Sequence, residues 1–316
     1  MTGPSNDPCV GVVVIEAPAD EPDRVVIDVA CAGISKMEPH WITSWQNADG
    51  TPRQQPVVLG LEFAGRVRSL GCAVEGLTVG QNVMGMLDPY YAGAMAEFVS
   101  AEAKTTLPIP GGLSYEQAAA LPLSGQTAWQ ALVRYGELRR GQRVLIHGGA
   151  GAVGSFAVQI ARWIGAHIVV TAAARDEALC RRLGANEVID FEHDHFEDHD
   201  SDYDLVFDQI GGEVQERSWA VLKRGGRLIT IAGEEADAPD QKRARELGVS
   251  AQFFVVDNNL PELRQLTDLV TAGAVRPVIG KRFDFASAIE AFDHRSSHFA
   301  GKAVLAASGS TLLPIL

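Results

Sequence analysis

Short apolar runs fill the first quarter of the chain, and apolar and polar residues alternate within them as they do in half-buried strands. The runs cover residues 10–18, 23–35 and 57–71. Glycines recur at short intervals between residues 60 and 85, which fits the tight corners of a bent sheet. The pattern therefore predicts a small, barrel-like β domain at the start of the chain.

From residue 114 onward the pattern changes to alternating strands and helices. Ser114 is placed to cap a helix, because an acidic residue and a run of alanines follow it. Strand-like runs then alternate with helix-like stretches, the strands at 143–149, 167–173, 187–190, 203–211 and 226–233 and the helices at 153–166, 176–185 and 262–273. This alternation is typical of a parallel sheet with helices on both faces. A last run, 301–307, predicts a strand that returns to the first domain.

Length and charge narrow the class of protein. A chain of 316 residues exceeds the usual size of a single core, so we expect about two domains. The net charge of −13 disfavours nucleic acids and anionic membranes as partners. Apolar runs are too short to span a bilayer and the N-terminus lacks a signal-peptide pattern, so a cytoplasmic location is expected. The cysteines form no C-x-x-C pair, which argues against a zinc knuckle or a redox motif.

The strongest local motif is a glycine cluster between the strand at 143–149 and the helix at 153–166. Gly149, Gly151 and Gly154 have the spacing G-x-G-x-x-G. In such a loop one glycine makes the tight turn, one lets the backbone approach a pyrophosphate, and one lets the helix pack on the strand. The N-terminus of the helix then faces the phosphates, so Gly149, Ala152, Val153 and their neighbours predict a dinucleotide site.

The next strand favours one dinucleotide. NAD sites usually carry a carboxylate near the end of this strand, whereas here the strand ends in alanines, including Ala173. Arg175 follows at once, and a guanidinium suits the 2′-phosphate of NADPH. The alternative is that Arg175 is a solvated surface residue and that a nearby acid such as Asp176 binds the ribose. We favour NADPH.

Several segments together resemble the medium-chain dehydrogenase/reductase superfamily, and more narrowly its zinc-free quinone oxidoreductase-like branch. The resemblance covers nearly the whole chain and rests on VVLGLEFAGRV, AAALPLSGQTAWQAL, GGAGAVG, LGANEVIDF, FDQIGG and FFVV. It implies an α/β protein with a GroES-like β-rich catalytic domain and a Rossmann domain with a doubly wound parallel sheet. The implied boundaries are 1–122 for the first part of the catalytic domain, 123–261 for the Rossmann domain and 262–316 for the return.

The resemblance also implies an activity. Members of this branch use NADPH to reduce quinones or activated carbon–carbon double bonds, such as enones and enoyl groups, and homodimers are common among them. The expected partners are therefore a small-molecule substrate and a second copy of the chain, with neither nucleic acid nor membrane.

The ligands of a catalytic zinc are missing. Zinc-dependent members carry a histidine where this chain has Leu61, and their first cysteine ligand falls near Ser35. A catalytic zinc needs about three protein ligands of N, S or O type. We therefore expect no metal, and a zinc alcohol dehydrogenase is disfavoured. Conjugate reduction fits better, because the charge that collects on an oxygen can be stabilised by hydrogen-bond donors.

Candidates for catalysis are few. Ser35 stands where family members often carry an asparagine, and His40 aligns with a tyrosine of one subset. His40 is a candidate to donate a proton or bond the substrate oxygen, or it is a plain surface-loop residue. Tyr90 is another candidate donor, and Gln126 replaces a usual leucine. Solvent can also protonate the product enolate, so the protein need not supply the acid.

Other residues are expected to contact the cofactor or the substrate. The resemblance places Thr127 beside the nicotinamide, and Gln209 ends a strand where the cofactor crevice is expected. The remaining cofactor candidates are Phe191, Phe254 and Val255, besides Ala173 and Arg175. Aromatic candidates for an apolar substrate pocket are Trp41, Trp45 and Tyr91, which are as typical of core packing. The tryptophan-rich loop at 35–46 suggests a tailoring reductase of secondary metabolism.

Two alternatives remain open. The segment 191–204 contains His193, His195 and His199 among acidic residues and looks metal-binding, but such charge runs are usually solvated surfaces. Secondly, because the catalytic residues are the least defined part, the chain could be an NADPH-binding sensor or structural protein without turnover.

Overall fold

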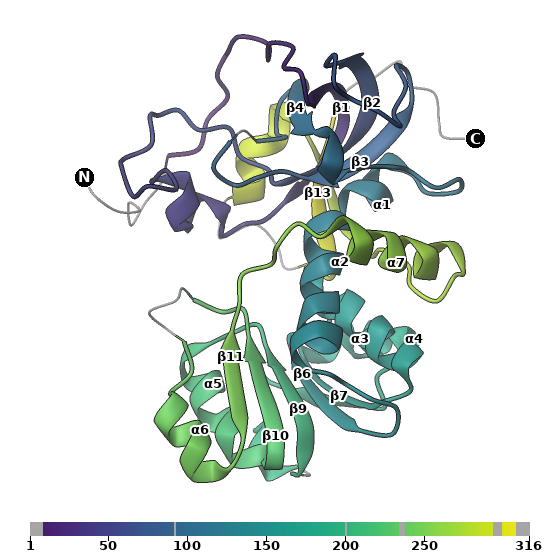
Figure 1. The fold of residues 1–316 in the computed structure, drawn as a ribbon. Coiled ribbons are helices and arrows are strands. Elements are labelled where there is room, and N and C mark those ends of the chain that lie inside the picture. Colours follow the sequence, from purple (N-terminus) through teal and green to yellow (C-terminus); the bar gives the residue numbers. More distant parts are fainter. Residues whose placement is uncertain (1–8, 92, 200, 234–237, 293–298, 308–316) are drawn as a thin grey trace. The chain divides into compact units, whose positions relative to one another are not determined.

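The computed structural model describes residues 9–91, 93–199, 201–233, 238–292 and 299–307. The chain divides into two compact units, which Figure 1 colours by position along the sequence. The first unit contains residues 1–123, 258–267 and 277–316, and the second contains 124–257 and 268–276. The C-terminal return to the first unit is therefore interrupted, whereas a single stretch was expected.

A seven-stranded sheet forms the core of the first unit. Its strands are β1 (Arg24–Ile34), β2 (Glu62–Leu70), β3 (Asn82–Met86), β4 (Phe98–Glu102), β5 (Thr106–Pro108), β12 (Ile279–Asp284) and β13 (Lys302–Ala306). The order is β12-β13-β1-β2-β3-β5, with β4 also paired to β1. Because β13 pairs antiparallel with β1, the predicted return of the chain end is confirmed. Fully buried Val25, Ile27 and Phe63 lie at the centre of the core.

One expected strand is absent. Residues 10–18 form neither helix nor strand, and the side chains of Val12 and Val14 are exposed. A strand needs a neighbour for its backbone hydrogen bonds. The adjacent strand β1 already pairs with β2, β4 and β13, so alternation of apolar residues alone was misleading here.

Short helical segments cover the turns of the first unit. They are the 3₁₀ turns Glu38–His40, Ile42–Ser44 and Ala103–Thr105, the helix α1 (Tyr115–Ala119) and the 3₁₀ segment Phe285–Phe292. The predicted cap of α1 is confirmed: Ser114 accepts the N–H of Gln117, whose side chain accepts the N–H of Ser114 in return.

The second unit is built on a six-stranded sheet in which every pair of neighbouring strands is parallel. The strands are β6 (Arg143–His147), β7 (His167–Ala172), β8 (Glu187–Asp190), β9 (Tyr203–Asp208), β10 (Leu222–Thr230) and β11 (Ser250–Phe253). Their order, β11-β10-β9-β6-β7-β8, is the doubly wound order of a Rossmann domain. The predicted fold class is thus confirmed.

Helices lie on both faces of this sheet. They are α3 (Ala152–Ile164), α4 (Glu177–Leu183), α5 (Gly212–Ser218) and α6 (Gln241–Leu247). The same unit contains a π-helical segment (Gln130–Tyr135) and 3₁₀ turns at Ala174–Asp176, Phe196–Asp198 and Trp219–Val221. The helices α2 (Pro122–Trp129) and α7 (Leu260–Thr271) each contain residues of both units. In Figure 1, α3 and α4 lie on one side of the sheet, and α5 and α6 on the other. This follows from right-handed crossovers that run outward in both directions from β6 and β9. Within the described residues, no helix is long and apolar enough to cross a membrane.

Candidate functional site

The glycine loop lies at the carboxyl end of β6 and leads directly into α3. Gly149 packs against β7, because an added Cβ would lie 2.6 Å from the Cβ of Val170. At Gly154 an added Cβ would lie 2.1 Å from the carbonyl oxygen of Gly148. At Gly151 the nearest atom is that same oxygen, at 3.3 Å. Packing therefore requires Gly149 and Gly154, whereas an added Cβ at Gly151 would meet only that one oxygen within 4 Å, which agrees with a position where backbone approaches a pyrophosphate.

The N-terminus of α3 suits an anion. Its N-cap residue is Gly151, which has no side chain to occupy the first N–H groups of the helix. Those groups, including the N–H of Ala152 and of Val153, have no partner within the helix. With the partial positive charge of a thirteen-residue helix behind them, they can hold a phosphate.

The strand order reverses between β6 and β9, so their carboxyl ends form the switch point of the sheet. Gln209 donates its side-chain N–H to the carbonyl oxygen of His147 at 2.8 Å and ties the two strand ends together. Asp208 is fully buried and accepts the N–H groups of Ile210 and Gly211, at 2.9 and 3.0 Å. Gln209 thus lies where it was expected, and Asp208 shapes the loop after it.

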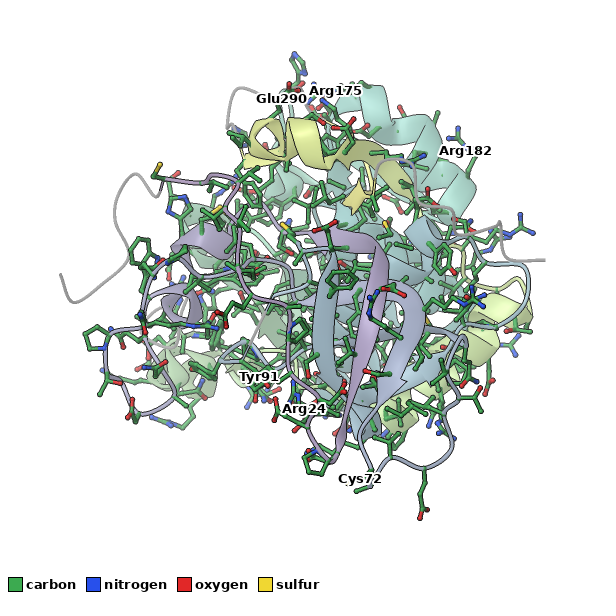
Figure 2. All side chains as sticks on the ribbon, turned by 90° about the horizontal axis from the view of Figure 1, so that it is seen from above. Arg24, Cys72, Tyr91, Arg175, Arg182 and Glu290 are labelled. Carbon is green, nitrogen blue, oxygen red and sulfur yellow. The ribbon has the colours of Figure 1, made fainter. Side chains whose placement is uncertain are left out.

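The end of β7 carries a cation rather than a free carboxylate. Ala173 is buried, and Asp176, the nearest acid, is only 9% exposed. Arg175, labelled in Figure 2, has half of its side chain exposed. Its guanidinium lies 3.2 Å from a carboxylate oxygen of Glu192. The group available to a ligand at this strand end is therefore the guanidinium of Arg175, whose partner in this structure is Glu192.

Three exposed apolar side chains mark the same edge of the sheet. Phe191 follows β8, Ile210 follows β9 and Val255 follows β11, and they are 56%, 57% and 73% exposed. Because these strands are parallel, the three residues share the carboxyl edge with the glycine loop. Exposed large apolar side chains at such an edge are suited to cover the flat rings of a ligand.

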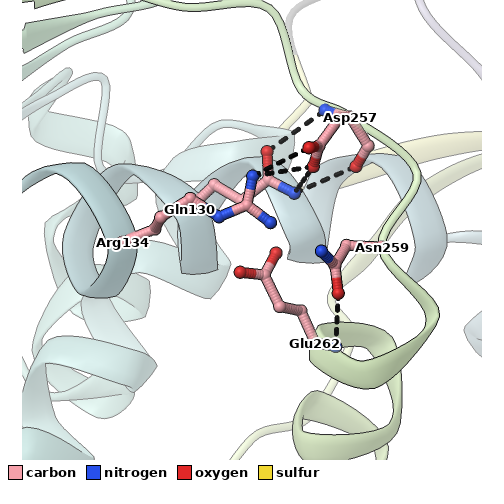
Figure 3. A network of polar contacts seen from close by, with 5 residues as sticks. All are labelled: Gln130, Arg134, Asp257, Asn259 and Glu262. Carbon is pink, nitrogen blue, oxygen red and sulfur yellow. Dashed lines mark hydrogen bonds and ion pairs between the residues drawn. The ribbon is translucent and has the colours of Figure 1, made fainter.

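A polar network holds the segment after β11 on the π-helical segment (Figure 3). Gln130 donates to the carbonyl oxygen and to a carboxylate oxygen of Asp257, at 2.9 and 2.7 Å, and Arg134 contacts both carboxylate oxygens at 2.9 Å. Nearby, the ring of Phe254 lies 4.7 Å from that of Tyr135, between centroids. The network fixes the stretch that includes Phe254 and Val255, which the sequence assigned to the cofactor.

Gln126 and Thr127 belong to α2, and both are buried, at 0% and 5% exposure. Gln126 therefore has no surface through which a ligand could reach it in this structure. A catalytic role for it stays a prediction.

In the first unit, Ser35 lies beside a buried ion pair. Lys302 and Glu62 are 1% and 0% exposed, and the Lys302 ammonium lies 2.5 Å from Oε1 of Glu62. The same ammonium donates to the hydroxyl oxygen of Ser35 at 3.3 Å. Gly33, on the strand between them, makes room for the pair, because an added Cβ would lie 2.2 Å from Oε1 of Glu62. Ser35 itself is half-buried.

A second buried acid lies nearby and was not singled out from the sequence. Glu38 is 4% exposed, and its Oε1 accepts the N–H of Gly60 at 2.6 Å. Its other oxygen, Oε2, is buried and has no hydrogen-bond partner among the described atoms. Burial raises the pKa of Glu38 from its ordinary 4.5 to about 7, although the Gly60 N–H and the charge of Lys302 act in the opposite direction.

The loop after Ser35 carries the predicted histidine and tryptophans. His40 ends a 3₁₀ turn, and His40, Trp41 and Trp45 are all half-buried. Trp45 donates its indole N–H to the carbonyl oxygen of Pro39 at 2.8 Å, so this side chain holds the loop together. A role in substrate binding stays a prediction for all three.

Arg53 joins this loop to the loop that carries the tyrosines. Its guanidinium donates to the carbonyl oxygens of Thr43 and Pro89, both at 2.7 Å, and to that of Tyr91 at 2.9 Å. Tyr90 and Tyr91 are both exposed. The structure thus brings the two aromatic loops of the first unit together.

Tyr91 is occupied by other contacts. Its hydroxyl donates to Glu21, and the guanidinium carbon of Arg24 lies 3.5 Å from the centre of its ring (Figure 2). Burial and the bond to Glu21 raise the pKa of Tyr91. A role for Tyr91 in the wall of a substrate pocket stays a prediction, because its hydroxyl and ring already contact Glu21 and Arg24.

Comparisons with known proteins agree with this architecture. Residues 21–111 match the alcohol dehydrogenase GroES-like domain family, and residues 183–305 match a family described as zinc-binding dehydrogenase. The chloroplastic NADPH-dependent alkenal/one oxidoreductase of Arabidopsis thaliana is 31% identical over 302 residues, which cover 92% of this chain and 74% of that protein. The mitochondrial NAD(P)H oxidoreductase RTN4IP1 of Danio rerio is 29% identical over 324 residues, 90% of this chain and 84% of that protein. The structure of the quinone oxidoreductase from Coxiella burnetii has a TM-score of 0.85 and 29% identity, covering 92% of this chain and 93% of that one.

The chain belongs to the medium-chain dehydrogenase/reductase superfamily. Within that superfamily it falls in the quinone oxidoreductase and alkenal reductase-like branch. It is accordingly an oxidoreductase of this superfamily.

The residues of this superfamily member do not fit a catalytic zinc. The two positions aligned with ligands hold Leu61, which has no donor atom, and Ser35, whose oxygen accepts a hydrogen bond from the ammonium of Lys302 at 3.3 Å. A divalent cation bound at Ser35 would lie beside that buried positive charge. The charge repulsion and the missing donor both oppose metal binding at this place.

The histidine-rich segment does contain a cluster of ligand-type atoms. Asp190, Glu192 and His193 have such atoms within 4.8 Å of one another, and they are half-buried or exposed. His193 lies 2.6 Å from Asp190, which raises the pKa of His193, and Glu192 pairs with Arg175. These side chains satisfy one another at the surface, which agrees with a solvated charge run.

Proposed function

We propose that the protein is a zinc-independent oxidoreductase that uses NADPH to transfer hydride to a quinone or to an activated carbon–carbon double bond. The observation that carries the proposal is the open glycine loop that leads into α3 at the switch point of the six-stranded sheet. The relatives named NADPH-dependent alkenal/one oxidoreductase and quinone oxidoreductase support the reaction class.

The geometry of the second unit supports the proposed cofactor residues. The backbone at Gly151, Ala152 and Val153 would hold the pyrophosphate, and Arg175 the 2′-phosphate. NADPH, when bound, supplies the hydride. Further contacts are proposed for residues along the carboxyl edge of the sheet, namely Phe191, Gln209, Phe254 and Val255, and for Thr127 of α2.

The residues at the expected zinc positions support the proposed substrate class. Leu61 and Ser35 do not fit a metal ion, and a zinc-independent enzyme would lack the Lewis acid that stabilises an alkoxide in alcohol oxidation. Addition of hydride to an enone or a quinone instead places charge on a carbonyl oxygen, which hydrogen-bond donors can stabilise. We therefore propose small aromatic or conjugated carbonyl compounds as hydride acceptors. We also propose that the enzyme is a homodimer.

A panel of acceptors tests the proposal. Purified protein is mixed with NADPH and with quinones, enones and saturated ketones, and the decrease in NADPH absorbance is recorded. We expect turnover with quinones or enones and none with saturated ketones. Binding of NADPH, measured by its fluorescence, without turnover of any acceptor would instead favour the sensor, the second candidate function.

A further inference from the structure

Ser35 and Lys302 face each other across two neighbouring strands. In the antiparallel pair of β1 and β13, Ile34 pairs with Ala303. Ser35, the residue directly after β1, therefore lies opposite Lys302, the first residue of β13. On the other side of β1, the β2 residue Glu62 completes the row. The strand order β13-β1-β2 thus places the Lys302 ammonium, the Ser35 hydroxyl and the Glu62 carboxylate side by side where these three strands begin or end.

The contacts give each group a defined role. The ammonium of Lys302 forms an ion pair with Oε1 of Glu62 at 2.5 Å, and Oε2 of Glu62 accepts the N–H of Leu123 at 2.8 Å. The buried pair is therefore neutral as a whole, and breaking it would leave a buried charge uncompensated. The same ammonium donates a hydrogen bond to the hydroxyl oxygen of Ser35 at 3.3 Å.

The hydroxyl of Ser35 is polarised by this arrangement. A serine hydroxyl has one proton and two acceptor positions, and Lys302 occupies one acceptor position. The proton of Ser35 must therefore point elsewhere, and Ser35 is the only member of the three that is not buried. A hydroxyl that accepts a charge-assisted bond in a low-dielectric surrounding is a stronger donor in its turn.

We propose that Ser35 is the hydrogen-bond donor for the oxyanion that forms during reduction, and that Lys302 and Glu62 are its positioning residues. The inference rests on the proposed function. Bound NADPH would supply the hydride: a C–H bond of its dihydronicotinamide would break and one at the β-carbon of the enone would form, while the π electrons of the double bond move toward the carbonyl and NADP⁺ remains. The negative charge on the oxygen is held by the Ser35 hydroxyl, and a proton from water then completes the product.

Removal of the hydroxyl is the first test. Ser35→Ala should lower kcat about a hundredfold, the usual effect of losing one oxyanion donor, and should leave the Kd for NADPH unchanged. Ser35→Thr should retain most of the activity. Ser100→Ala is the matched control, because its hydroxyl also accepts from a buried cation, Arg24, at 3.0 Å in the same unit. An unchanged kcat in Ser35→Ala would overturn the proposal.

The positioning role needs a readout of its own. Lys302→Met with Glu62→Gln removes both charges together and so avoids leaving a buried unpaired charge. This double variant should lower kcat about tenfold, and adding Ser35→Ala to it should cost much less than in the native protein, because residues that act through one another are not additive. Full additivity would contradict the role of Lys302.

A spectroscopic measurement tests the donor without turnover. 4-Nitrophenol absorbs differently as phenol and as phenolate, and an oxyanion donor lowers the pKa of the bound form. The native protein should bind it with the phenolate favoured, and Ser35→Ala should lose that preference. Absence of binding, or an equal preference in both proteins, would refute the donor role. If no acceptor is turned over at all, the proposed function fails, whereas turnover that does not depend on Ser35 refutes only this inference.

Discussion

Burial of the Glu38 carboxyl, whose Oε2 has no hydrogen-bond partner among the described residues, predicts how the stability of the fold depends on pH. Its pKa lies at about 7 in the folded protein against an ordinary 4.5, mainly because of burial. Below pH 4.5 the acid is protonated in both states. Between the two values only the unfolded chain releases the proton, so folding becomes less favourable as the pH rises. The loss is complete above the folded value and amounts to roughly 3 kcal/mol.

Glu38→Gln removes this titration and keeps the shape of the protonated acid, including the acceptor for the Gly60 N–H. We expect the variant and the native protein to have similar stability at pH 4, and the variant to be more stable by roughly 3 kcal/mol at pH 8.5. The difference between the two curves is the quantity to analyse, because other groups titrate as well. In particular, burial lowers the pKa of His147 to about 4, which makes the native protein lose stability as the pH falls.

The assay must report on the first unit. Hydrogen exchange of peptides from β1, followed by mass spectrometry at several urea concentrations, measures the opening of that unit alone. Glu75→Gln is the control, since Glu75 lies exposed on the same unit and its loss should leave the curve unchanged. Parallel curves for Glu38→Gln and the native protein from pH 4 to 8.5 would show that the buried carboxyl does not titrate as argued.

Three further predictions follow from single contacts. Arg175→Ala should remove most of the preference for NADPH over NADH, about ten- to a hundredfold in Kd measured by fluorescence titration. Glu192→Gln should increase that preference, because it frees the guanidinium of Arg175 from its carboxylate partner. Equal affinities of the native protein for the two cofactors would refute the assignment. Gly33→Ala should displace Glu62 from Lys302 and destabilise the protein by about 3–5 kcal/mol in urea unfolding, so an unchanged midpoint would contradict the ion pair. Metal analysis should find no stoichiometric zinc, and one zinc per chain would overturn the argument from Leu61 and Ser35.

The second unit was largely predictable because its determinants are local. A strand, a glycine loop and a helix follow one another within residues 143–166, and packing of Gly149 and Gly154 depends on neighbours in that same unit. The strand end at Arg175 could likewise be interpreted from its own sequence. The partner of Arg175 could not, because Glu192 reaches it from the loop after another strand.

The first unit was less predictable because its site is assembled from distant segments. Glu62 and Lys302 were not singled out, since a charged residue in a sequence is expected at the surface. One signal was present: Gly33 interrupts the apolar second half of β1, and a glycine there indicates close approach of another group. The loop at 35–46 suggested aromatic and histidine chemistry, whereas the buried acid Glu38 within it becomes visible only from its burial and its bond to Gly60.

The charges of the first unit are coupled through Lys302. Its ammonium is paired with Glu62, and it also lowers the pKa of Glu38, which Glu62 raises. With Glu38 protonated, the three groups carry no net charge, and only Glu62 offsets the field of Lys302 at the hydroxyl of Ser35. Ionisation of Glu38 adds a second negative charge to the group and weakens that field. A pH above the pKa of Glu38 should therefore both destabilise the fold and weaken the Ser35 hydroxyl as a hydrogen-bond donor. At such a pH the Glu38→Gln variant should be more stable than the native protein, and its kcat should depend less on pH.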